Sequence, residues 1–159
     1  MGTGNACPGA ALRGLRVAMM AGTVLASTAW AQVPGEKAVG GILVTVGVAP
    51  IEQIESLPAG RPERLMHAHH GANERDHLVV ALADQRTGKS IRHADVTATV
   101  SQIGMGERRH ALERMDEYGT TSWGGYFDLR KGGPYVIRLR VSRPGLATPI
   151  EADFVYRAQ

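Results

Sequence analysis

The chain has one cysteine among 159 residues and few aromatic side chains, and the cysteine, Cys7, lies close to the N-terminus. Residues 32–159 contain no cysteine at all. This absence excludes disulfides, thiolate metal sites and cysteine nucleophiles from that part of the chain. Its core must come from hydrophobic burial alone, which a domain of this size can provide.

The excess of positive over negative charge is also small. The formal net charge is +3, but Arg13 and Arg16 stand in the first 31 residues, which hold no acidic group. Residues 32–159 carry 16 basic and 15 acidic side chains. No dense field of Lys and Arg remains to neutralise phosphates, so nucleic-acid binding is not expected.

The N-terminal segment has the organisation of a secretory signal peptide. Arg13 and Arg16 precede an apolar run over 17–26, and the small residues Ala29 and Ala31 then form an A-x-A cleavage site. The apolar run is too short to span about 30 Å of hydrocarbon. We expect cleavage after Ala31 and a mature periplasmic protein of residues 32–159; an uncleaved membrane anchor is the alternative.

Alternation of apolar and polar residues dominates the rest of the chain, and long helical periodicity is hard to find. Turn signals rich in Gly and Pro separate the alternating segments, a pattern typical of an antiparallel sandwich. We therefore predict an all-β, immunoglobulin-like antiparallel β-sandwich of about seven strands in a single domain. The expected strands are 42–48, 77–83, 96–101, 110–115, 120–129, 135–141 and 150–157.

Two local patterns in these strands carry further expectations. Gly124-Gly125 interrupts the aromatic strand 120–129, which suggests a bulge or a close backbone approach. His77 opens a strand that is apolar on both faces. If Val79 and Ala81 share its face, we expect that face to be the core, with the imidazole at its edge.

A long insertion, residues 51–76, separates the first two expected strands. Ile51, Ile54 and Leu57 are spaced for one or two helical turns before Pro58. A polar, histidine-rich run follows. Long loops in compact domains are usually functional or disordered, and loops on a rigid scaffold often carry binding groups.

Signatures of enzymes are missing. The sequence contains no G-x-S-x-G, no H-E-x-x-H and no phosphate-binding P-loop. We therefore expect a protein that is not an enzyme.

The histidines indicate a different chemistry. Four of the six fall within eleven residues, and Met66 begins the cluster. Neutral imidazole is the commonest metal ligand, and imidazole combined with thioether suits copper. The members of the cluster are His67, His69, His70 and His77. For the first three, the alternative to metal binding is a solvated loop without a ligand. For His77, the alternative is a structural role.

Other candidates lie further along the chain. Met115 follows a polar stretch near a strand end, where a methionine is either a soft ligand or core filler. Glu113 or Asp116 could add an oxygen ligand or orient an imidazole. His93 and His110 are expected at the surface.

Three stretches resemble a group of small bacterial periplasmic β-sandwich proteins of iron and copper handling, near the FixH and YtkA-like sandwiches. They are residues 77–82 with Thr87-Gly88, residues 115–127 and residues 132–139, within a region of roughly 76–157. The resemblance implies a metal site to which His77 and Met115 contribute. Metal-binding members place a further histidine in the segment that here reads 122–126, where this chain has none. The missing ligand would then come from Met66, His67, His69 or His70.

These observations support two functional hypotheses. The first is a periplasmic accessory protein that binds a transition metal, copper or alternatively iron, for storage, delivery or transport. The second is an interaction module without enzymatic activity that docks on a membrane transporter or a periplasmic protein. Trp123, Tyr126 and Phe127 would form its contact patch, and core packing is the alternative for these three side chains.

Overall fold

The computed structural model describes residues 32–61, 64, 71–102, 104–117, 119–129 and 134–158. The predicted signal peptide lies outside these residues. Within the described ranges, no helix has the length and apolar character that crossing a membrane requires.

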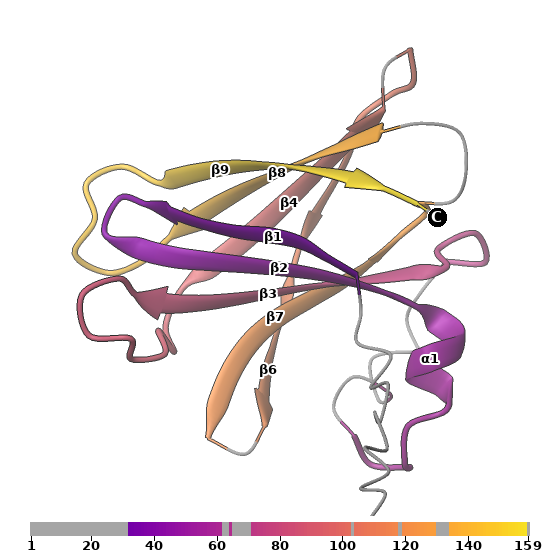
Figure 1. The fold of residues 1–159 in the computed structure, drawn as a ribbon, viewed down its shortest axis with the longest axis horizontal. Helices are drawn as coiled ribbons and strands as arrows, with labels where there is room; N and C mark the ends of the chain where they lie inside the picture. The colour runs from indigo at the N-terminus through magenta and orange to yellow at the C-terminus, as the bar shows by residue number, and fades with distance from the viewer. Residues whose placement is uncertain are drawn as a thin grey trace, which may run out of the picture.

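Two antiparallel sheets face each other in a sandwich, and a short helix lies at one end (Figure 1). The larger sheet has the order β1-β2-β3-β7-β6 and the smaller one β5-β4-β8-β9. The predicted all-β antiparallel sandwich is confirmed. The elements are β1 (Gln32–Val39), β2 (Ile42–Pro50), α1 (Ile51–Glu55), β3 (Asp76–Asp84), β4 (Asp95–Gln102), β5 (Arg108–Ala111), β6 (Glu113–Glu117), β7 (Thr120–Phe127), β8 (Pro134–Ser142) and β9 (Ile150–Arg157).

The main core lies between the sheets and follows from the alternation in the sequence. In β8, Ile137 and Leu139 are fully buried, whereas Arg138 between them is exposed and pairs with Asp153 of β9. Burial of one face of each strand, roughly 25 cal/mol per Å² of apolar surface, is the main force that holds the two sheets together.

The described residues form nine strands where about seven were expected. β1 was missed because its residues, which include Gly35, Glu36 and Lys37, lack a clear alternation; its register with β2 also shifts between Gln32 and Gly35. The expected strand 110–115 is two strands in different sheets. At Leu112, which is buried and whose N–H bonds to the Val96 carbonyl at 2.8 Å, the chain crosses from β5 to β6.

The predicted orientation of β3 is wrong. Its core-facing residues are Leu78, Val80 and Leu82, at 0–2% exposure. His77 shares a face with Val79 and Ala81, as expected, but this is the outer face of the larger sheet. Alternation could not decide the question because β3 is a central strand with apolar residues on both faces.

The aromatic strand β7 contains no bulge. Its register with β3 and with β6 runs without a shift through Gly124-Gly125. Trp123 and Phe127 lie in the main core at 1% exposure, and Tyr126 is 6% exposed on the outer face. Of the two interpretations of these aromatics, the contact patch is therefore wrong and packing within the domain is confirmed.

The insertion after β2 begins as predicted, with a helical turn. α1 buries Ile51 and Ile54 and packs on β2 and β3. The Ile51 N–H donates to the Arg75 carbonyl at 2.8 Å, and the Arg75 N–H donates to the Phe127 carbonyl at 3.1 Å. Both ends of the insertion are therefore fixed beside the start of β3, directly next to His77.

Candidate metal centre

Gly124 is the centre of a group of side chains on the outer face of the larger sheet. The strand register places it opposite Val79 of β3 on one side and Glu113 of β6 on the other. His77 is opposite Tyr126, and Met115 is opposite Ser122. His77 and Met115 consequently stand diagonally across Gly124, one on each neighbouring strand.

The missing side chain of Gly124 leaves the space in which His77 and Met115 meet. A Cβ atom built on Gly124 would lie 2.5 Å from the His77 Nε2 and 2.8 Å from the Met115 Cε. Contacts this short do not occur in folded proteins, so any side chain here would displace the two groups. The glycine pair was expected to mark a bulge or a close backbone approach; instead, side chains approach it closely.

Both groups are withdrawn from solvent. His77 is 0% exposed and Met115 is 4% exposed, and neither belongs to the main core between the sheets. The Tyr126 ring stacks on the His77 imidazole, with centroids 4.7 Å apart and planes inclined by 26°. The outer face therefore holds a second buried cluster, in which stacking fixes the orientation of the imidazole.

The two acidic candidates on β6 have different positions. Glu113 faces the same side as Met115 and is exposed next to Gly124. Asp116 faces the opposite side, where it accepts a hydrogen bond from the Thr121 hydroxyl at 2.6 Å and pairs with Arg114 at 2.9 Å. These contacts, Thr121 first, hold the pKa of the Asp116 carboxyl below its usual range. Asp116 is engaged by Thr121 and Arg114, so Glu113 is the acidic candidate that remains beside Gly124.

An imidazole nitrogen and a thioether sulfur form a soft donor pair, which suits copper, particularly Cu(I). The described residues contain no group of three His, Cys, Asp or Glu side chains placed to hold an ion. The remaining predicted donors, Met66, His67, His69 and His70, lie outside the described residues. The structure thus brings two of the six predicted site residues together.

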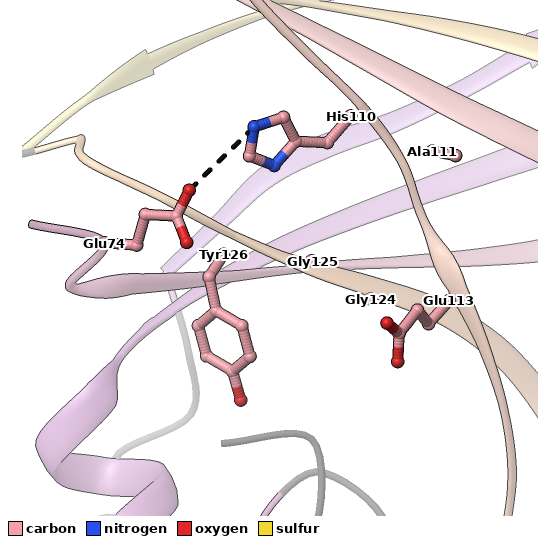
Figure 2. Close-up of a pocket in the computed structure, with 7 residues that line it drawn as sticks. All are labelled: Glu74, His110, Ala111, Glu113, Gly124, Gly125 and Tyr126. Atoms are coloured by element: carbon pink, nitrogen blue, oxygen red, sulfur yellow. Dashed lines mark ion pairs between the residues drawn. The ribbon is translucent and has the colours of Figure 1, made fainter. Parts of the chain in front are cut away.

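A pocket of about 230 Å³ borders the same glycine and was not expected from the sequence (Figure 2). His110, which we expected at the surface, is half-buried there, whereas His93 is exposed as expected. The His110 ring stacks on Phe127 with centroids 4.9 Å apart, and its Nε2 lies 3.9 Å from the Glu74 Oε1. Glu74 and His110 come from segments far apart in the chain, so no local pattern could have paired them. The pocket is lined by Glu74, His110, Ala111, Glu113, Gly124, Gly125 and Tyr126.

Comparison with known proteins identifies structures with the same fold. No protein-family model and no curated protein matches the sequence. FetP of uropathogenic Escherichia coli strain F11, crystallised after expression in the periplasm, matches 78% of this chain and 92% of its own, with a TM-score of 0.57 and 11% identity. A copper-bound variant of Campylobacter jejuni P19 matches 80% of this chain and 96% of its own, with a TM-score of 0.58 and 13% identity. A DUF4426 family protein from Pseudomonas aeruginosa matches 77% and 92%, with a TM-score of 0.54 and 14% identity. At these identities the similarity establishes a shared β-sandwich fold.

Proposed function

We propose that this chain is an exported β-sandwich protein that binds a copper ion and serves as an accessory in its storage, delivery or transport. His77 and Met115 are the proposed scaffold ligands. The observation that carries the proposal is the convergence of the His77 Nε2 and the end of the Met115 side chain above Gly124.

The donor chemistry favours copper over the other common metals. Thioether is a poor ligand for magnesium, calcium and manganese, which prefer oxygen, whereas copper accepts imidazole nitrogen and thioether sulfur together. Full burial of the imidazole also removes competing water from the site. This donor pair gives less support to iron, the alternative metal.

The proteins that share the fold add independent support. P19 has been crystallised in copper-bound form, and FetP has a copper-bound variant. FetP was recombinantly expressed in the periplasm, a compartment consistent with the export expected from the leader of this chain. A membrane transporter or a periplasmic protein is the partner that such a role requires.

Two protein donors rarely complete a copper site, so we propose that the histidine-rich segment supplies the rest. This segment leads directly into β3, whose second residue is His77. Met66, His67, His69 and His70 are its candidate donors, and Glu113 is the nearest carboxylate on the scaffold. No chemical transformation is part of the proposed role.

Competition titration with Cu(I) and Cu(II), supported by calorimetry, tests this proposal. His77→Ala and a triple His67/His69/His70→Ala variant should each weaken binding at least about tenfold, equivalent to about 1.4 kcal/mol. Met115→Leu, which keeps the side-chain volume, should weaken Cu(I) more than Cu(II). His93→Ala, on an exposed histidine, is the matched control and should bind as the wild type does. Wild-type affinity in all variants, with the fold retained by circular dichroism, would refute the proposal.

A further inference from the structure

The Glu74–His110 pair in the pocket is preorganised. The Glu74 Oε2 accepts a hydrogen bond from the Gly71 N–H at 2.7 Å, which leaves Oε1 directed toward His110. Figure 2 shows the carboxylate and the imidazole, both of which line the pocket, pointing toward each other. Stacking on Phe127 holds the imidazole from behind. A nitrogen and an oxygen are thereby held facing each other across 3.9 Å.

The spacing of these two atoms brings both within reach of one metal ion. An ion bound to nitrogen and oxygen lies about 2.0–2.2 Å from each. The two atoms are 3.9 Å apart, so a small approach of the two side chains gives the spacing of neighbouring ligands. The His110 side chain is 37% exposed and the Glu74 side chain 18%, so water can supply the other ligands of the ion. Two protein donors and exchangeable water make a weak site that releases its ion quickly.

The position of the pocket relates this weak site to the buried pair. Gly124 lines the pocket, and the His77 Nε2 and the Met115 Cε approach the same residue. Glu113 lines the pocket as well and faces the same side of the sheet as Met115. The pocket that holds the exposed pair therefore also contains a carboxylate beside Gly124.

We propose that Glu74 and His110 form a second, weaker Cu(II) site at the mouth of this pocket, which captures the ion and passes it to His77 and Met115. The capture site stands on its own geometry, whereas its role in loading rests on the proposed function. A simple ion pair that fastens residues 71–75 to the sandwich is the competing explanation.

Stopped-flow loading with substoichiometric Cu(II) separates these explanations. His110→Phe keeps an aromatic ring against Phe127, and Glu74→Gln keeps an acceptor for the Gly71 N–H. Each should slow loading at least about tenfold and leave the equilibrium affinity of the buried site within about twofold. Glu52→Gln is the matched control, because Glu52 also lies 3.9 Å from a basic partner, Arg75, but outside the pocket. It should load at the wild-type rate.

A second measurement keeps the capture site testable even if the buried site fails. A variant that combines His77→Gln, Met115→Leu and the triple His67/His69/His70→Ala substitution should still bind one Cu(II) weakly, with an electron paramagnetic resonance spectrum of nitrogen and oxygen ligands. Adding His110→Phe should abolish this signal. Failure of wild-type protein to bind Cu tightly would refute the proposed function, whereas retention of this weak signal would still support the capture site. Three results would overturn the capture role. The first is an unchanged loading rate in both variants. The second is a loss of equilibrium affinity as large as the loss of loading rate, and the third is a change in thermal stability alone.

Discussion

Gly124→Ala is the substitution that most directly probes the meeting point of His77 and Met115. The new methyl group would lie 2.5 Å from the His77 Nε2 and 2.8 Å from the Met115 Cε. Met115 can swing its terminal methyl away, but the imidazole is stacked on Tyr126 and packed on all sides. The alanine methyl group should therefore push the His77 imidazole and the Met115 thioether out of the space that they share above residue 124.

Two effects of known size are expected from this substitution. Overpacking of a buried site costs about 1–3 kcal/mol of folding free energy. Part of this loss is recovered because alanine has less backbone freedom than glycine when unfolded, a gain of about 0.4–1 kcal/mol. Gly124 does not have a positive φ, so no backbone strain adds to the cost. Copper affinity should fall at least about tenfold because the two donors no longer converge.

Gly125→Ala is a matched control on the opposite face of the same strand. Its Cβ would lie 2.8 Å from the Leu112 Cδ2 in the main core, so it causes a clash of similar severity. Urea denaturation should show comparable losses of stability for the two variants, whereas copper titration should show a loss of affinity only for Gly124→Ala. Wild-type copper affinity in a folded Gly124→Ala protein would refute the placement of the site above Gly124.

Three further predictions concern the scaffold and the leader. Leu139→Ala should cost about 2–5 kcal/mol by urea denaturation, whereas Arg138→Ala, which breaks an exposed pair with Asp153, should cost at most about 1 kcal/mol; equal midpoints would contradict the assigned faces of β8. Thr121→Val should raise the pKa of Asp116 in an NMR titration, because the Thr121 hydrogen bond lowers this pKa. The stabilisation that this hydrogen bond contributes is lost as the pH falls through the folded-state pKa of Asp116. An unchanged titration of Asp116 would contradict the assigned contact. Export should remove residues 1–31, and mass spectrometry of periplasmic protein that retains them would contradict the predicted cleavage.

The sheet architecture could be predicted because burial of one face imposes a period of two on most strands. The prediction failed where that signal is absent or ambiguous. β1 carries few apolar residues, and β3 is apolar on both faces, so its inner face was assigned incorrectly. The split between β5 and β6 at Leu112 was invisible because a buried leucine fits a continuous strand as well as a crossing between sheets.

The candidate site was predictable only in part. His77 and Met115 were named from a resemblance, and the glycine pair signalled a close approach at Gly124. Their convergence depends on the register of three strands, which no local pattern encodes. The pairing of Glu74 with His110 has the same origin, since it arises when the end of the insertion returns beside an edge of the other sheet.

X-ray absorption spectroscopy of the Cu(I)-loaded protein identifies the atoms bound to copper. We expect a mixed shell of nitrogen and sulfur scatterers. The sulfur contribution should decrease in Met115→Leu and disappear when Met66→Leu is added, while the nitrogen shell persists. Since residues 32–159 contain no cysteine, a thiolate of the mature chain cannot supply that sulfur. A wild-type spectrum without sulfur, or a sulfur shell unchanged by Met115→Leu, would contradict copper binding between His77 and Met115.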